Sequence, residues 1–225
     1  MRRHTQLLSA MLIFAASGNV RAEKGQTELT LEPGAAMPIS TAGDYAGHSF
    51  ELDASHFFDF HEVAAFGWEA GYLFSSTFGG TLPSKVVPTV QGVANPGNLS
   101  FSSDLSLSIL HVTPEFKFGP TLAWAPFKVN PFLIGGGGLY WTHYQSGTLM
   151  VTGALPGGGT LSNTPVAYGG GNDVNGGFNV GGGLSLEFPQ NWSVGAEVRY
   201  HHIYYGKGVN DTSYIVPSVR FSLLF

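Results

Sequence analysis

The last twelve residues of the chain alternate between apolar and polar side chains. Counting back from Phe225 in steps of two gives only apolar residues, whereas the intervening set contains Ser222, Arg220 and Ser218. Successive side chains of a β-strand point to opposite faces. Residues 214–225 are therefore predicted to form a strand with one apolar face and one charged face. Such a strand suits a transmembrane β-barrel, with the apolar face in lipid and Arg220 in the lumen.

The same period of two recurs along the rest of the chain. It is clearest after residue 63, where Phe66, Trp68 and Tyr72 alternate with small residues and Glu69. Polar stretches rich in Gly, Pro, Ser and Asn separate such segments, as expected for strands joined by turns and loops. The eight predicted strands are residues 27–39, 48–60, 64–78, 104–118, 131–144, 176–188, 192–204 and 214–225.

Two of these segments depart from strict alternation. In 104–118 the apolar residues change parity between Ile109 and Leu110, which predicts a β-bulge at that point or a register that alternation alone misassigns. In 48–60 the predicted lipid-facing set includes His56, a polar exception among aromatic and aliphatic residues.

Aromatic residues gather near the ends of the predicted strands. Within 131–144, the predicted lipid-facing residues are Phe132, Ile134, Tyr140 and Tyr144. Amphipathic rings at both bilayer interfaces are typical of transmembrane barrels. The predicted inner belt comprises Phe60, Phe66, Phe118, Phe132, Phe188, Trp192 and Phe225, and the outer belt comprises Tyr72, Tyr140, Tyr144, Tyr204 and Tyr214.

The connections between strands alternate between short and longer ones. Residues 61–63, 119–130 and 189–191 are predicted turns, whereas 79–103 and 145–175 are predicted long loops. Short periplasmic turns and longer outer loops are the asymmetry of outer-membrane barrels, and an even strand count places both ends on the periplasmic side. Lipid cannot satisfy an open sheet edge, so the sheet must close. The predicted fold is all-β, an eight-stranded antiparallel up-and-down transmembrane β-barrel.

Composition agrees with a barrel wall. The 225 residues are 11% charged and 13% aromatic, and 32 of them are glycine. No apolar run beyond residue 22 is long enough for a transmembrane helix. Cysteine is absent, which excludes disulfides and thiolate chemistry.

The beginning of the chain resembles an export signal. A charged start and the apolar run Leu7–Ala16 predict a signal peptide over 1–22, cleaved after Ala22. The apolar run is too short for a membrane anchor. Residues 23–225 are then the barrel domain. Cleavage removes three arginines and leaves a net charge of −8 in place of −5, which argues against nucleic acid as a partner.

Charged residues lie mainly at those alternate positions of the predicted strands whose side chains face the lumen. We call these positions the inward parity. An eight-stranded barrel is just wide enough for side chains to fill, and buried charges are costly unless paired. A charge network that plugs the lumen is therefore predicted. Glu197 is expected to pair with Arg220, and Glu187 with Arg199. His111 and His201 share the inward parity, as do Glu51 and Asp53. The predicted network comprises Glu32, Glu69, Glu115, Lys117, Glu187, Glu197, Arg199 and Arg220.

Two segments carry a family resemblance. Residues 192–200, with the sequence WSVGAEVRY, and 219–225, with the sequence VRFSLLF, resemble the small outer-membrane β-barrels of the OmpA/OmpX and opacity-protein type. The resemblance implies an eight-stranded barrel in the bacterial outer membrane. It also implies an assembly signal at Phe221, Leu223 and Phe225, with the final aromatic residue recognised by the barrel-assembly machinery. It does not imply one function.

The favoured function is a structural or surface-interaction role in the outer membrane. The predicted partners are outer-membrane lipid, lipopolysaccharide and a surface ligand that contacts loops 79–103 and 145–175, because loops carry specificity on rigid scaffolds. A narrow channel is the second hypothesis. Acidic inward residues outnumber basic ones, so such a channel would prefer cations. A soluble β-sandwich also remains open, because a period of two does not distinguish lipid from a protein core.

A lipid A hydrolase is the third hypothesis, raised by His201, His202 and Asp211. The deacylase pattern places a serine two residues after the histidine, and here those positions are Ile203 and Tyr204. A histidine and an acid without a nucleophile do not make a triad, so no enzyme activity is predicted. No cofactor is predicted, because the glycine runs lack the Lys-Ser/Thr of a nucleotide loop. No metal site is predicted, because the histidines form no ligand motif.

Overall fold

The computed structural model describes residues 25–39, 45–46, 49–61, 63–82, 87–124, 126–205 and 211–225. The predicted signal peptide, residues 1–22, lies outside these ranges. Among the described residues, no helix has the length and apolar character needed to cross a bilayer.

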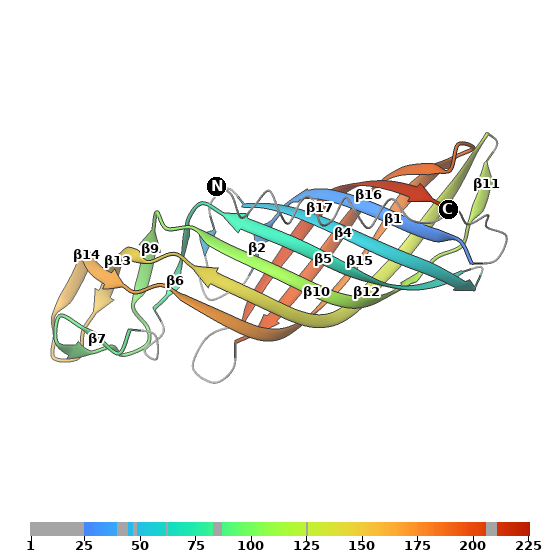
Figure 1. Cartoon of the computed structure of the whole chain (residues 1–225). Helices are drawn as coiled ribbons and strands as arrows, with labels where there is room; N and C mark the ends of the chain where they lie inside the picture. The colour runs from blue at the N-terminus through green and yellow to red at the C-terminus, as the bar shows by residue number, and fades with distance from the viewer. Residues whose placement is uncertain are drawn as a thin grey trace, which may run out of the picture.

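Eight long strands form a closed antiparallel barrel (Figure 1). Each strand pairs with the next barrel strand in the sequence, and the first also pairs with the last, which closes the sheet. The predicted fold class is therefore confirmed. The barrel strands are β1 (Thr27–Ala35), β4 (Ser49–His61), β5 (Ala64–Ser75), β10 (Leu107–Phe118), β12 (Phe127–Tyr144), β15 (Gly171–Phe188), β16 (Trp192–Tyr204) and β17 (Thr212–Leu224).

The two ends of the barrel differ. At one end, Thr27 and Phe225 exchange backbone hydrogen bonds of 3.1 and 2.9 Å, and Asn191, with a φ of 62°, lies in the tight turn between β15 and β16. We call this the turn end. The opposite end, called the loop end, carries the long connections between β5 and β10 and between β12 and β15 (Figure 1).

The outer wall of the barrel is apolar. Val198, Phe221 and Leu133 are 54%, 50% and 69% exposed, whereas Arg220 is fully buried. Val198 and Phe221 lie on the predicted lipid-facing parity, so the pattern read from the last two strands is confirmed. His56 also faces outward as predicted, with its ring centroid 6.2 Å from that of Trp68. The apolar exterior is the surface that a bilayer requires of a barrel.

The predicted bulge in β10 is wrong. Pairing of β10 with β5 runs without a shift from Leu107 to Phe118, through both Ile109 and Leu110. Ile109 is instead a buried inward residue and Leu110 its outward neighbour. The two adjacent apolar residues arise because the lumen itself is apolar at this level.

The predicted facing of β12 is also wrong. Phe132, Ile134 and Tyr140 are buried inside the barrel, and Leu133 and Leu139 are among the residues that face outward. Both faces of this strand are apolar on either side of four glycines, so parity cannot be assigned from the sequence alone. Phe132, Tyr140 and the buried Tyr214 of β17 consequently do not belong to the predicted aromatic belts. Tyr144 does not belong to them either, because its ring packs against Phe78 with 5.5 Å between centroids.

The predicted turn at residues 119–130 is partly a hairpin. β11 (Leu122–Trp124) pairs with the first residues of β12, from Phe127 to Val129. This hairpin extends beyond the wall at the turn end (Figure 1).

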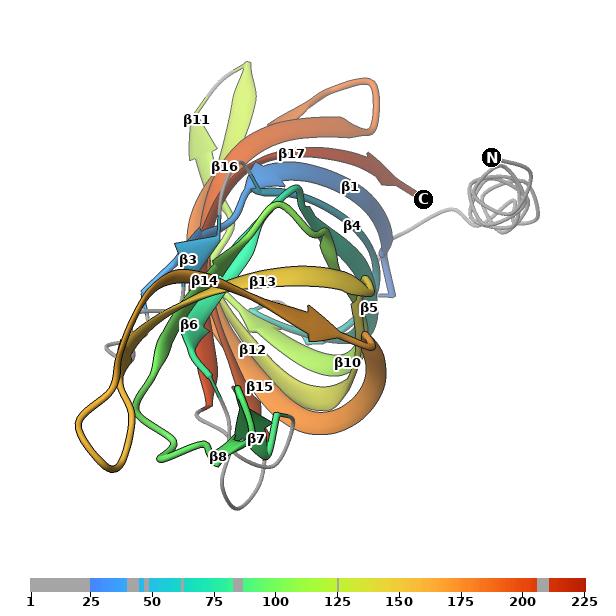
Figure 2. The same ribbon diagram turned by 90° about the vertical axis from the view of Figure 1, so that its left-hand side faces the viewer.

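Most strands of a second sheet come from the two predicted long loops, and one short strand, β3 (Tyr45–Ala46), comes from the connection between β1 and β4. Its strand order is β14-β13-β9-β6-β3, and it projects from the loop end of the barrel (Figures 1 and 2). A dry cluster that includes Leu82, Leu99, Leu149, Val151 and Leu161 forms its core. The prediction of irregular loops at 79–103 and 145–175 is therefore wrong. The additional strands are β2 (Met37–Pro38), β3 (Tyr45–Ala46), β6 (Phe78–Thr81), β7 (Thr89–Val90), β8 (Val93–Ala94), β9 (Ser100–Ser103), β13 (Gly147–Ala154) and β14 (Thr160–Tyr168).

Candidate functional site

The lumen of the barrel is lined by buried ionisable groups. Every residue of the predicted network faces inward, and all but Lys117 are buried. Glu28 also belongs to the network, although the predicted set omits it. Glu28 lies four residues before Glu32 on the same strand, so both side chains face the lumen. This alternation is the sequence signal that could have identified Glu28. The buried carboxylic acids of the lumen are Glu28, Glu32, Glu51, Asp53, Glu69, Glu115, Glu187 and Glu197.

Arg220 is the centre of the first cluster. Its Nη2 atom donates to Oε1 of Glu28 at 3.1 Å, and its Nη1 atom lies 3.1 Å from Oε1 of Glu32. Nη1 also donates to Oε2 of Glu197 on the adjacent strand β16. The expected pairing of Glu197 with Arg220 is thus present. Charge-assisted bonds of this kind offset the desolvation of a buried guanidinium.

Arg199 is the centre of a second cluster. Its Nε atom donates to Oε1 of Glu197 at 2.6 Å, and its Nη1 atom lies 3.5 Å from Oε1 of Glu115. Nη1 also pairs with Glu69. Glu197 thus links the two arginines, because its second oxygen accepts from Arg220. The two clusters form one continuous network across the lumen.

The expected pairing of Glu187 with Arg199 is wrong. Glu187 accepts a hydrogen bond of 2.6 Å from Lys128 on β12, because β12 begins earlier than predicted and brings that lysine level with Glu187. Lys117 of β10 pairs with Glu28 of β1. The lysines thus form ion pairs with carboxylates near the turn end of the lumen, whereas the arginines form ion pairs with carboxylates in its middle.

Glycines on β12 and β15 make room for these long side chains. Glu115 lies directly opposite Gly136, and a Cβ atom at Gly136 would lie 2.8 Å from Cγ of Glu115. Arg199 lies opposite Gly181 in the same way. The glycine runs therefore act as close-packing positions of the barrel wall.

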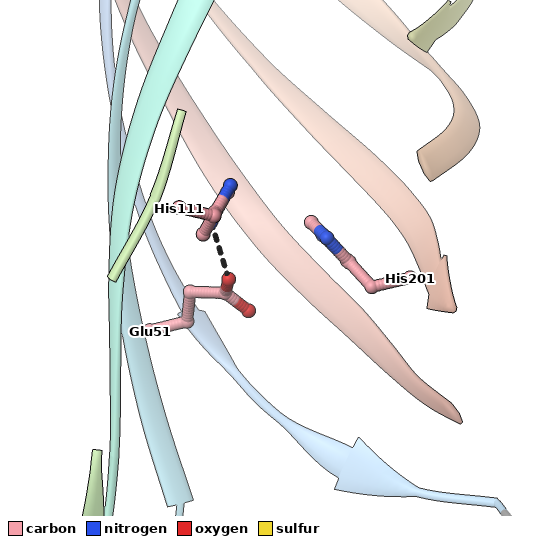
Figure 3. Close-up of side chains that lie close together, drawn as sticks. All are labelled: Glu51, His111 and His201. Atoms are coloured by element: carbon pink, nitrogen blue, oxygen red, sulfur yellow. Dashed lines mark hydrogen bonds and ion pairs between the residues drawn. The ribbon is translucent and has the colours of Figure 1, made fainter. Parts of the chain in front are cut away.

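Two histidines meet in the part of the lumen nearer the loop end. Nε2 of His111 lies 3.0 Å from Oε1 of Glu51 and 3.2 Å from Oδ1 of Asp53. The rings of His111 and His201 lie near each other (Figure 3), with 5.1 Å between their centroids. The His201 ring also stacks on that of Tyr214. Sequence reasoning places the two histidines and both carboxylates inward. It misses the cluster because alternation along a strand does not show which residues of different strands lie at the same level in the barrel.

Apolar layers lie on both sides of the charged groups. Toward the loop end, Leu73, Ile109 and Ile203 belong to one buried cluster. Toward the turn end, Phe57 and Phe132 belong to another. The ionisable groups between these layers are therefore in a dry environment, where their mutual pairing is strong and an unpaired charge is costly.

The two adjacent histidines of β16 face opposite sides of the wall. His201 is buried in the lumen, whereas His202 faces outward, with Nε2 3.5 Å from Oδ2 of Asp211. Nδ1 of His202 lies 2.8 Å from Oγ of Ser213 on β17. Sequence reasoning misses this serine because strand pairing, and not local spacing, places it directly opposite His202.

The residues of the predicted assembly signal lie at the turn end. Phe221 and Leu223 face outward and are exposed. Phe225 is half-buried, and its backbone pairs with Thr27. Its recognition by the assembly machinery stays a prediction.

Comparison with known proteins identifies the class of fold. No protein-family model and no curated protein matches the chain. Among solved structures, Neisserial surface protein A (NspA) matches with 13% identity and a TM-score of 0.56, over 90% of this chain and all of that one. Ail of Yersinia pestis, in complex with the heparin analogue sucrose octasulfate, matches with 10% identity and a TM-score of 0.45. The N-terminal β-barrel domain of Pseudomonas aeruginosa OprF matches with 12% identity and a TM-score of 0.41. Both matches cover 90% of this chain and all of the other.

The chain therefore has the fold of the small eight-stranded outer-membrane β-barrels. NspA carries this conclusion, because its TM-score is the one above 0.5 among these three. The resemblance inferred from residues 192–200 and 219–225 is confirmed at the level of fold. Identities of this size give the architecture and leave the activity to be argued from the site.

Proposed function

We propose that the protein is an integral outer-membrane barrel that acts at the cell surface through the sheet at its loop end. The observation that carries the proposal is that this sheet has a hydrophobic core of its own, with Leu149 and Val151 fully buried. A connection that served only to join strands would not need such a core. A rigid platform above a membrane barrel suits contact with an external ligand.

The chemistry of this platform is polar and nearly neutral. Within 145–175 the only charged residue is Asp173, and Thr148, Ser162 and Asn163 are exposed on β13 and β14. Burial raises the pKa of the Tyr168 phenol, and the charge of Asp173 adds to the shift. Tyr168 consequently remains uncharged at neutral pH. The ligand class that fits is one recognised by hydrogen bonds, such as the sugars of lipopolysaccharide or of a host surface.

The test is to compare cells that display the protein with cells that display a variant in which a Gly/Ser linker replaces residues 147–168. We expect loss of binding to lipopolysaccharide and host-cell glycans in the variant, with the barrel still heat-modifiable on a gel. Equal binding by both cell populations, with the barrel intact, would overturn the proposed role.

We further propose that the lumen does not conduct ions. The network that joins Arg199 to Arg220 through Glu197, together with the apolar layers on either side of it, supports this view. Current through a planar bilayer should not exceed that of the empty bilayer. Steady cation-selective steps from the purified protein would support a channel instead.

The proposed location also depends on export and assembly. Signal-peptide cleavage after Ala22 and recognition of Phe225 are required for insertion into the outer membrane. We expect N-terminal sequencing of the mature protein to begin at Glu23, and deletion of Phe225 to lower the heat-modifiable fraction in outer membranes. A mature chain that still contains residues 1–22 would contradict the first expectation.

A lipid-ester hydrolase is a second candidate, favoured by the contact between Ser213 and His202. In this reaction Nδ1 of His202 would accept the Ser213 proton while Oγ attacks an ester carbonyl. The ester C–O bond would then break, and His202 would protonate the departing alcohol. Water would release the fatty acid and restore Ser213. Asp211 would orient the ring, as the third group of a triad does.

Mass spectrometry of lipid A separates this candidate from the surface role. Hydrolysis predicts that cells expressing the protein lose one acyl chain per lipid A, and that Ser213→Ala restores it. Ser218→Ala is the matched control, because Ser218 lies on the same strand but faces inward. Identical lipid A with and without the protein would remove the candidate.

A further inference from the structure

The loop-end part of the lumen contains a set of metal-ligating side chains from three strands. Glu51 lies on β4, His111 on β10 and His201 on β16. One ligand atom from each can be chosen so that all three lie within 4.8 Å of one another. All three residues are fully buried, and both imidazoles extend into the same space beside Glu51 (Figure 3).

The separations in this cluster are close to those of a coordinated ion. A tetrahedral ion with bonds of about 2.1 Å holds its ligand atoms about 3.4 Å apart. Nε2 of His111 lies 3.0 Å from a Glu51 oxygen and 3.2 Å from an Asp53 oxygen. The ligand atom of His201 lies within 4.8 Å of those of Glu51 and His111.

Several polar atoms of the cluster have no hydrogen-bond partner among the described residues. They are Oε2 of Glu51, Nδ1 of His111 and Nε2 of His201, each on a fully buried side chain. A buried polar atom without a partner is costly. The hydroxyl of Tyr140 contacts Nδ1 of His201 at 3.2 Å, which leaves Nε2 as the free ligand atom. A hydrogen bond at the other ring nitrogen orients the imidazole, as it does in metal-bound histidines.

Carboxylates outnumber arginines in this region of the lumen. Glu51, Asp53 and Glu69 are buried together, and Arg199, the arginine paired with Glu69, is shared with Glu115 and Glu197. Buried carboxylates without compensation are strongly unfavourable. A divalent ion held by neutral imidazoles would balance this excess.

Gly71 of β5 keeps the site open. A Cβ atom at this position would overlap both Oδ1 of Asp53 and Nε2 of His111. The strand thus provides, at the level of the cluster, the space that the two ligand-bearing side chains occupy.

We propose that Glu51, His111 and His201 bind one zinc ion inside the barrel, with Asp53 beside it as a further carboxylate. Two imidazoles and a carboxylate are a zinc ligand set, whereas calcium and magnesium prefer oxygen ligands alone. Local sequence spacing gives no sign of this site, because its ligands come from three separate strands. The apolar layers on both sides of the site imply that the ion enters during folding and is then retained.

The test is to refold the chain without its signal peptide, residues 23–225, in detergent micelles with equimolar zinc sulfate or with EDTA. After desalting, metal content is measured by plasma mass spectrometry and stability by the urea midpoint of the heat-modifiable band. We expect one zinc per folded chain and a higher midpoint with zinc than with EDTA.

Two variants and a control separate the site from adventitious binding. His201→Gln and Glu51→Gln should each fold into a heat-modifiable barrel, contain no retained zinc and show the same midpoint in zinc and in EDTA. His202→Gln, on the same strand but outside the lumen, should retain the metal. A folded wild-type barrel without zinc would overturn the proposal, as would zinc that survives both substitutions or is lost in the control. These outcomes do not depend on a surface ligand, so they are distinct from the test of the surface role.

Discussion

The guanidinium carbon of Arg220 lies 4.6 Å from the centroid of the Phe132 ring. Its nitrogens contact Glu28, Glu32 and Glu197. An aromatic face and three carboxylates thus surround one fully buried positive charge, and β1, β12, β16 and β17 are joined through it.

Replacement of Arg220 by Met should destabilise the barrel by about 3–5 kcal/mol. Removal of one partner of a buried ionic network leaves the other charges uncompensated. The measurement is urea unfolding in detergent micelles followed by tryptophan fluorescence. Lys128→Met is the control, because Lys128 is largely exposed and an exposed pair contributes about 1 kcal/mol or less. Equal losses in the two variants would contradict the role given to Arg220.

Replacement of Gly71 by Ala should destabilise the fold although it adds one methyl group. The new Cβ would overlap Asp53 and His111, and overpacking of this kind typically costs about 1–3 kcal/mol. The same unfolding assay measures the loss. Gly169→Ala should be neutral, since a Cβ there meets no described atom within 4 Å. An unchanged Gly71→Ala barrel would show that the lumen can relax at this position.

A charge on the outer wall should be costly in proportion to its depth in the bilayer. Val198 lies in the middle of β16 and Val174 near the loop end of β15, and both are exposed. Lysine should cost about 2–4 kcal/mol at the midplane and about 1 kcal/mol or less near an interface. Unfolding from lipid vesicles should therefore distinguish Val198→Lys from Val174→Lys. Equal costs would place Val198 away from the hydrocarbon core.

Truncation of Leu149 should loosen the second sheet and leave the barrel closed. Leu149 is fully buried in the core of that sheet, and a buried Leu→Ala change costs about 2–5 kcal/mol. Limited proteolysis should cut the variant within residues 147–168 faster than the wild type. Met150→Ala, on the exposed side of the same strand, should be cut at the wild-type rate. If the core is not formed in solution, the two variants will be cut alike.

The sequence predicts the barrel well where the two sides of the wall differ in chemistry. Val198 and Arg199 alternate between lipid and lumen, so a period of two identifies both faces and the limits of β16. The same rule fails where the lumen is apolar. Ile109 and Leu110 are adjacent apolar residues, as are Phe132 and Leu133. Because both members of each pair are apolar, the rule that polar side chains face the lumen does not show which one points inward.

Contacts between side chains of different strands are harder to predict from the sequence. Parity places Glu51, His111 and His201 inside, but their common height depends on the stagger of strands around the barrel. The contact between His202 and Ser213 depends on the same register. The second sheet is missed for another reason. Leu149 and Val151 alternate with other residues, but the many glycines around them make the segment resemble a loop.

The seam between β1 and β17 has a consequence for biogenesis. Glu28 pairs with Leu224 and Leu31 with Phe221, so the cylinder cannot close before both β1 and β17 are available for pairing. Until that moment both unpaired edges expose backbone groups that invite association with other chains, and contacts between such distant residues slow folding. A chain in which β17 has not yet paired with β1 is therefore the form most prone to association through its strand edges.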